Sequence, residues 1–130
     1  MAIRIAVDTN RYRDFCASDP VAVDRFQTAE QIFLPFIVLA ELRAGFLCGT
    51  KTRQNESILS RFLNRQRVSI LNPTEGTTHQ YAQLFFQLRR QGTPIPTNDI
   101  WIAALVVEHN LTLFSRDHHF DHLPQIPHLD

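Results

Sequence analysis

Short apolar, β-branched runs alternate with stretches of helical periodicity, and this alternation constrains the fold more than any other feature of the chain. The expected strands are 3–7, 32–34, 68–71 and 111–115, with a short final strand near Ile126. Strands separated by helices favour a parallel sheet that is covered by helices on both faces. The 130 residues, of which 44% are hydrophobic, suffice for a single domain spanning 1–130 with a buried core.

Helical patterns fill the intervals between the expected strands. The first follows Asp8, and the others cover about 20–27, 36–46, 53–64, 74–90 and 97–109. Side chains that suit helix capping occur at or near several of the expected starts: Thr9, Asn10, Thr74, Thr97 and Asn98. We therefore expect an α/β fold in which every strand is followed by at least one helix or turn.

Four acidic residues lie at or beside apolar segments, where acidic side chains are normally avoided. Asp8 follows the first expected strand, Asp117 follows the fourth, Glu41 lies within an apolar helix, and Asp99 lies in the first turn of another helix. Parallel α/β proteins bind ligands beyond the carboxyl ends of their strands, so these acids are expected to converge there. Each acid alone also has an ordinary explanation, as a helix cap, a solvated surface residue, a partner of the helix dipole or a loop acid.

A cluster of carboxylates has a specific chemical consequence. Several carboxylates held together repel one another and resist ionisation unless a cation lies among them. Hard divalent ions such as Mg²⁺ and Mn²⁺ prefer oxygen ligands. The pattern therefore predicts a metal-dependent enzyme that acts on phosphate esters.

The charge composition limits the kinds of molecule that the protein is expected to bind. The formal net charge is zero, which argues against a broad, nonspecific polyanion binder. Twelve of the thirteen basic residues are arginines, with Lys51 the exception. The planar arginine side chain suits bidentate phosphate contact, although a codon preference in the genome would explain the same bias.

The chain carries features expected of a cytoplasmic protein. Its two cysteines, Cys16 and Cys48, lack CxxC spacing and are expected to be unpaired thiols. No apolar run approaches the roughly 20 residues that a membrane-spanning helix needs, and the N-terminus lacks the pattern of a signal peptide. We therefore expect no membrane association.

The four acids lie in segments whose order and spacing match a known family. The segments read Val-Asp-Thr-Asn at 7–10, Leu-Ala-Glu-Leu-Arg-Ala-Gly at 39–45, Asn-Asp-Ile-Trp-Ile-Ala-Ala at 98–104 and Ser-Arg-Asp-His-His-Phe at 115–120. Together they resemble the PIN-domain ribonucleases and, within that family, the VapC-type toxins of bacterial toxin–antitoxin pairs. The resemblance covers essentially the whole chain.

This resemblance implies a fold, an activity and partners. The implied fold is a three-layer α/β/α sandwich with a central parallel sheet of four or five strands. The implied activity is Mg²⁺- or Mn²⁺-dependent endonuclease cleavage of RNA. The implied assembly is a homodimer, paired with a cognate antitoxin whose C-terminal segment occupies the active-site groove.

The resemblance also assigns site residues. It places the acidic site on Asp8, Glu41, Asp99 and Asp117, with the three aspartates holding one or two metal ions. Glu41 would bind metal through water or orient the attacking water, and the sequence leaves this choice open. Polar neighbours expected to support the acids are Thr9, Asn10, Asn98 and Ser115, and Asp121 would be a further carboxylate near the site.

Two segments depart from the family pattern. After the first acid, Arg11 and Arg13 stand where apolar residues are usual. They would contact RNA phosphate or an antitoxin carboxylate, although a solvated helix face explains them equally well. Further along, His118 and His122 have the i, i+4 spacing of a helical transition-metal pair. A turn with Phe120 packed inside is the better explanation of that segment, because no third ligand at metalloprotease spacing accompanies the pair.

Two other functions stay open on sequence grounds. One is a different metal-dependent phosphoesterase, since Asp-His-His at 117–119 superficially matches the DHH phosphoesterases. The other is a PIN-like module that binds RNA or a protein without cleaving it. The presence of all four acids favours the enzyme.

Overall fold

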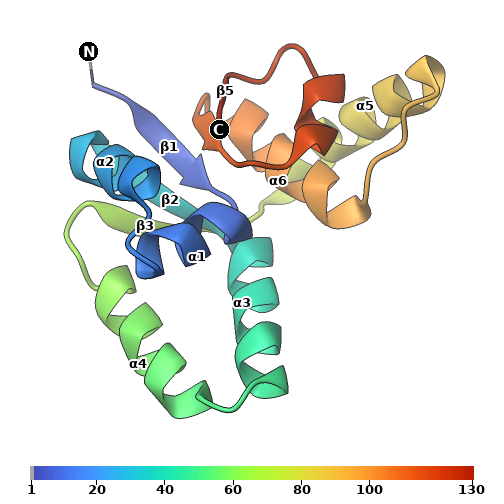
Figure 1. Cartoon of the computed structure of the whole chain (residues 1–130). Helices are drawn as coiled ribbons and strands as arrows, with labels where there is room; N and C mark the ends of the chain where they lie inside the picture. The colour runs from blue at the N-terminus through green and yellow to red at the C-terminus, as the bar shows by residue number, and fades with distance from the viewer. Residues whose placement is uncertain (1) are drawn as a thin grey trace.

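The computed structural model describes residues 2–130, and a five-stranded parallel sheet forms its centre (Figure 1). The strands are β1 (Arg4–Val7), β2 (Gln31–Pro35), β3 (Val68–Leu71), β4 (Thr112–Phe114) and β5 (His128–Leu129), arranged in the order β3-β2-β1-β4-β5. The chain first builds from β1 through β2 to β3, and later adds β4 and β5 on the other side of β1. The strand order therefore reverses between β1 and β4. Open α/β sheets bind ligands at such a switch point.

Helices occupy the intervals between the strands, as the alternation predicts. They are α1 (Thr9–Cys16), α2 (Pro20–Thr28), α3 (Phe36–Cys48), α4 (Thr52–Leu63), α5 (Glu75–Gln91), α6 (Thr97–Glu108) and the short 3-10 helix η1 (His118–His122). Thr74 caps α5 as expected, and its N–H donates to the hydroxyl of Thr77. The caps expected at two other helices were wrong: Asp8 caps α1, and Pro96 precedes α6.

Buried side chains on both faces of the sheet account for the three layers. Phe114 of β4 points toward α1 and α2, because its ring lies against Phe26 of α2 and under the guanidinium of Arg11. Leu113, which points to the opposite face by strand alternation, is also fully buried. In Figure 1 α1 and α2 cover the side of the sheet toward the viewer, and α5 and α6 pack along each other at the other end of the sheet, beyond β5. The predicted α/β/α sandwich is confirmed.

The expected strand near Ile126 was wrong in its position. The last strand pairs His128 with Leu113 and Leu129 with Phe114, two residues further along. The backbone N–H of Ile126 instead closes a turn onto the carbonyl of Leu123, and its side chain is buried from that turn. Burial of an apolar side chain in a loop thus produced the same sequence signal as a strand.

Among residues 2–130, no helix combines the length and the apolar character that crossing a bilayer requires.

Candidate functional site

The first and the last acidic segments meet where the carboxyl ends of β1 and β4 lie side by side. The N–H of Asp8 donates to the carbonyl of Phe114 at 3.0 Å, so the ends of β1 and β4 lie in register. Ser115 follows directly, and its hydroxyl donates to Asp8 Oδ2 at 2.6 Å while accepting the N–H of Asp117 at 3.0 Å. One buried hydroxyl therefore joins the two acidic segments.

Asp8 is buried at this junction, with 5% of its surface exposed. Its Oδ1 accepts the N–H of Thr9 at 2.7 Å, and the Nδ2 atom of Asn10 lies 3.5 Å from Oδ2. Burial raises the pKa of the Asp8 carboxyl, and the carboxylates of Glu41 and Asp117 raise it further. The hydrogen bonds from Ser115 and Thr9 oppose this rise, because they stabilise the ionised form.

Asp99 contributes a second buried carboxylate from the first turn of α6. Its Oδ2 lies 2.8 Å from Nδ1 of His119, and the same nitrogen lies 3.0 Å from Oδ1 of Asp117. Burial raises the pKa of Asp99 to about 6, and the charges of Asp117 and Asp8 act in the same direction. The hydrogen bond with Asp99 raises the pKa of His119, and the charges of Asp117 and Asp99 add to this rise.

Asp99, Asp117 and His119 offer three ligand atoms within 4.8 Å of one another. Two carboxylate oxygens and one imidazole nitrogen are ligands that divalent ions accept. Burial is the largest cause of the raised pKa values of Asp8 and Asp99, neighbouring carboxylates add to it, and a bound cation would favour the ionised forms. The donor set and the charge of the cluster therefore fit a divalent metal ion.

Glu41 approaches the cluster from α3. Its Oε1 accepts the hydroxyl of Thr9 at 2.7 Å, and the amide of Asn98 lies 3.4 Å from its Oε2. These two neighbours hold the carboxylate of Glu41 toward α1 and α6, although α3 is otherwise a largely apolar helix. The structure thus brings Glu41 to the same edge as Asp8, and among the described residues neither of the two belongs to the group of closest ligand atoms, which come from Asp99, Asp117 and His119.

His119 is the member of the cluster that sequence reasoning missed. The sequence offered a metal-binding pair at His118 and His122 on α-helical spacing, but favoured a turn with Phe120 packed inside, and the structure confirms the turn and the buried Phe120. The segment is a 3-10 helix, in which residues three apart share a face, and His118 accordingly pairs with Asp121 at 3.1 Å. Asp121 also lies 3.5 Å from His128, so within residues 2–130 its polar side-chain contacts are with His118 and His128 and not with the four acids.

The two arginines after Asp8 lie in different environments. Arg11 is buried, with 6% of its surface exposed, and its guanidinium contacts Asp14, Asp19 and the ring of Phe114. These contacts leave Arg11 turned into the protein, so its position does not favour the expected contact with RNA or antitoxin. Arg13 is exposed and lies over α3, where its Nη2 would come within 2.9 Å of a side chain at Gly45.

Comparison with known proteins supports a family assignment. The family model "PIN domain" matches residues 5–126. The chain is 30% identical over 90 residues, 69% of each chain, to the Mycobacterium tuberculosis protein named Ribonuclease VapC4. It is 33% identical over 94 residues, 67% of this chain and 69% of the other, to the Haemophilus influenzae protein named Ribonuclease VapC1.

Solved structures show the same architecture over nearly the full length. A chain of VapBC2 from Rickettsia felis, crystallised with a DNA fragment from the promoter, superposes with a TM-score of 0.86 at 27% identity, covering 98% of both chains. A chain of the DNA-bound VapBC from Salmonella typhimurium superposes with a TM-score of 0.87 at 21% identity and shares the fold. The sequence match and the shared architecture together show that this chain belongs to the PIN-domain family.

Proposed function

We propose that the protein is a VapC-type endoribonuclease, acting as the toxin of a type II toxin–antitoxin pair. The observation that carries the proposal is the convergence of Asp8, Asp99 and Asp117 with His119 at the β1–β4 junction. The matched relatives named Ribonuclease VapC support an RNA substrate. The protein would act in the cytoplasm, where RNA is accessible, with residues 1–130 forming a single PIN-like domain.

We propose Mg²⁺ or Mn²⁺ as the cofactor. Asp99 and Asp117 would hold the ion together with His119, and Asp8, which is joined to Asp117 through Ser115, would bind it directly or through water. Such an ion lowers the pKa of a bound water and offsets negative charge that develops on phosphate oxygens. The carboxylate-rich donor set favours a hard cation over a thiophilic one.

The remaining polar residues would prepare the site for hydrolysis. Ser115 donates to Asp8 and thereby favours its ionised, ligand-competent form. Glu41, held by Thr9 and Asn98, lies where a carboxylate can orient a water toward the phosphate. Asn10 joins the two strand ends, because its amide lies 3.4 Å from Ser115 Oγ and its oxygen accepts the N–H of Arg116.

The proposed partners are an antitoxin and a second copy of the chain. The Rickettsia felis and Haemophilus influenzae structures are of VapBC complexes, which supports a cognate antitoxin. A cavity of about 360 Å³ lies between α1, α3 and α4, and its lining of apolar and polar side chains, among them Tyr12, Arg13, Leu42, Phe46 and Asn55, would receive an amphipathic segment of such a partner. Phe85 and Phe86 of α5 are 45% and 60% exposed and would be covered in a homodimer.

A cleavage assay on total RNA tests the proposed function. Purified, antitoxin-free protein is incubated with total bacterial RNA in Mg²⁺, in Mn²⁺ and in EDTA, beside the variant Asp8→Asn. We expect discrete fragments that require metal and disappear with the variant. Folded, metal-supplied protein that binds RNA but cleaves no RNA class would favour a non-catalytic PIN-like module instead.

A further inference from the structure

Arg116 lies between two residues of the candidate metal site, in the loop that follows β4. Ser115 precedes it and bonds to Asp8, and Asp117 follows it and contacts His119. The backbone N–H of Arg116 donates to the side-chain oxygen of Asn10 at 3.1 Å. Contacts that hold Arg116 in place therefore also restrict the positions of Ser115 and Asp117.

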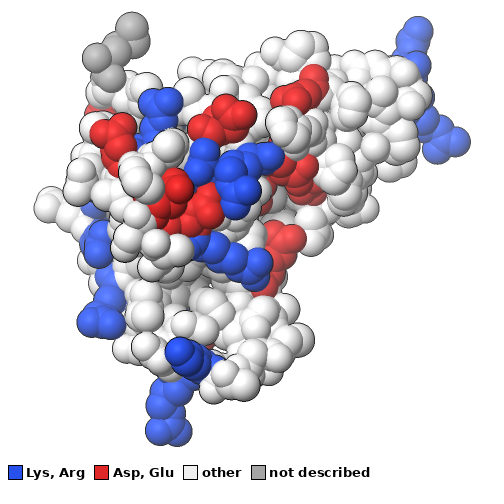
Figure 2. Space-filling view, viewed as in Figure 1, with Lys and Arg blue, Asp and Glu red and all other residues white. Residues whose placement is uncertain are grey.

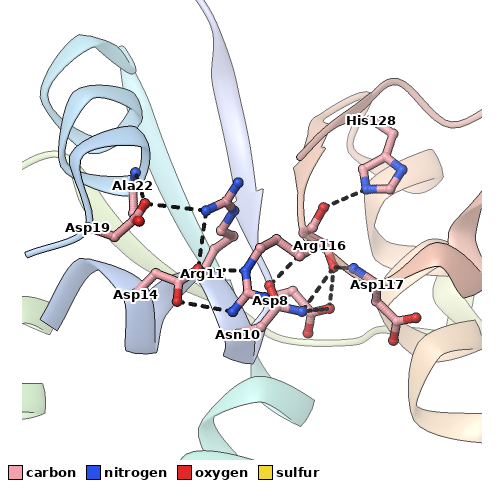
Figure 3. Close-up of polar contacts among 10 residues, drawn as sticks. Asp8, Asn10, Arg11, Asp14, Asp19, Ala22, Arg116, Asp117 and His128 are labelled. Atoms are coloured by element: carbon pink, nitrogen blue, oxygen red, sulfur yellow. Dashed lines mark hydrogen bonds and ion pairs between the residues drawn. The ribbon is translucent and has the colours of Figure 1, made fainter. Parts of the chain in front are cut away.

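The side chain of Arg116 is tied to α1 by a two-point ion pair. Its Nε and Nη2 lie 2.8 and 3.1 Å from the two carboxylate oxygens of Asp14. Asp14 is one helical turn after Asn10, so a single face of α1 binds Arg116 through its backbone and its side chain. Figure 3 shows this line of contacts from α1 to the loop.

Asp14 is itself held in place from the other side. The buried guanidinium of Arg11 lies 3.1 Å from Asp14 and 3.5 Å from Asp19, which caps α2. Hydrogen bonding with Arg116 lowers the pKa of the Asp14 carboxyl, so the pair is ionised at neutral pH. Figure 2 shows acidic and basic side chains intermixed at the centre of this face of the molecule.

The loop after β4 needs a contact that anchors it to α1, because it brings Asp117 close to Asp8 and Asp99 and these carboxylates repel one another. The charge of Asp117 opposes the ionisation of both Asp8 and Asp99, and the charge of Asp8 opposes that of Asp99. Repulsion would drive the loop away from β1 in the metal-free protein. The contacts of Arg116 with α1 oppose that movement, and they do so without occupying a ligand atom of the cluster.

We infer that Asp14 and Arg116 are positioning residues of the metal site, whose ion pair holds Asp117 beside Asp8 and Asp99. The inference rests on the proposed function, because it assumes that these acids bind a divalent ion. An exposed ion pair without this role would affect stability slightly and metal binding only through its charges.

The sign of the charge effect separates the two possibilities. Removing the positive charge of Arg116 should tighten cation binding if only long-range electrostatics act, and removing the negative charge of Asp14 should weaken it. Loss of a positioning contact should weaken cation binding in both variants. Arg116→Gln is therefore the decisive variant, because the two accounts predict opposite directions for it.

The experiment measures Mn²⁺ affinity by isothermal titration calorimetry at fixed ionic strength. It compares the wild type, Asp14→Asn, Arg116→Gln and the double variant. Arg43→Gln and Glu56→Gln are matched controls, since they break an exposed Arg–Glu pair at 3.0 Å between α3 and α4. Urea unfolding of each protein checks that it is folded, and hydrogen exchange of residues 115–119 without metal reports the loop itself.

We expect Asp14→Asn and Arg116→Gln each to weaken Mn²⁺ binding by roughly threefold to tenfold, with the double variant no worse than either. Exchange in the loop should rise in all three, and the controls should match the wild type. Unchanged or tighter Mn²⁺ binding by folded Arg116→Gln would overturn the inference alone. Absence of Mn²⁺ binding by the wild type would overturn the proposed function and the inference with it.

Discussion

Ser115 donates a 2.6 Å hydrogen bond from its fully buried hydroxyl to Oδ2 of Asp8. This contact joins two residues that are 107 positions apart in the chain and lie at the ends of adjacent parallel strands. It also gives a buried carboxylate a donor that favours its ionised form and opposes the rise in pKa caused by burial. This one hydroxyl therefore joins the ends of β1 and β4 and also favours the ionised form of Asp8.

Loss of that hydroxyl should be costly. Ser115→Ala removes the shortest donor to Asp8 and frees the N–H of Asp117, so we expect a loss of about 1–3 kcal/mol in the free energy of unfolding. Urea denaturation measures it, with Ser60→Ala on the exposed face of α4 as the control. A Ser115→Ala protein that is as stable as the wild type would show that the contact contributes nothing.

Asp99 should make the metal-free protein more stable in mild acid. Burial raises its pKa from 3.8 to about 6, so the folded state holds the proton more tightly than the unfolded state. Stability should therefore increase on the order of 1–2 kcal/mol as the pH falls from about 7 to about 4.5, relative to Asp99→Asn. His119 acts in the same direction, because its pKa is also raised, mainly by Asp99. Parallel pH profiles of the two proteins in urea denaturation would contradict the shift.

His119 should contribute to metal binding, and its neighbour should not. The ring of His119 lies against Asp99 and Asp117, whereas His118 is largely exposed and pairs with Asp121. We expect His119→Ala to weaken Mn²⁺ affinity by roughly tenfold, while His118→Ala leaves it unchanged. Equal affinities for both variants in calorimetric titrations would remove His119 from the ligand set.

Glu41 should affect the rate of RNA cleavage more than metal affinity. Its carboxylate contacts the side chains of Thr9 and Asn98. It lies outside the group of closest ligand atoms. For Glu41→Gln we expect cleavage to slow by about 100-fold or more, with Mn²⁺ affinity within about threefold of the wild type. A parallel loss of affinity and rate would instead identify Glu41 as a metal ligand.

The fold could be predicted from the sequence because its strands are short, apolar and separated by helices. The runs 68–71 and 111–115 coincide with or enclose β3 and β4, and Pro35 ends β2 as its last paired residue. The final strand could not be placed, since two residues beside Pro127 carry too little pattern. Its position depends on pairing with β4, which no local signal encodes.

The site was predictable in its acids and less so in their partners. Asp8 and Asp117 follow strands, and that position brings them together in any parallel sheet of this order. His119 was missed because its orientation depends on a 3-10 turn in place of an α-helical one. The burial of Arg11 was invisible for a similar reason, since its partner Asp19 belongs to the cap of the next helix.

The most direct test of the account follows cleavage of one defined RNA as Mn²⁺ is added, beside calorimetric Mn²⁺ binding to the same protein. We expect cleavage to rise with metal occupancy and to be absent in EDTA. We also expect no cleavage by Asp8→Asn, although that variant is folded and binds RNA. Cleavage in EDTA, or by Asp8→Asn at the wild-type rate, would contradict it.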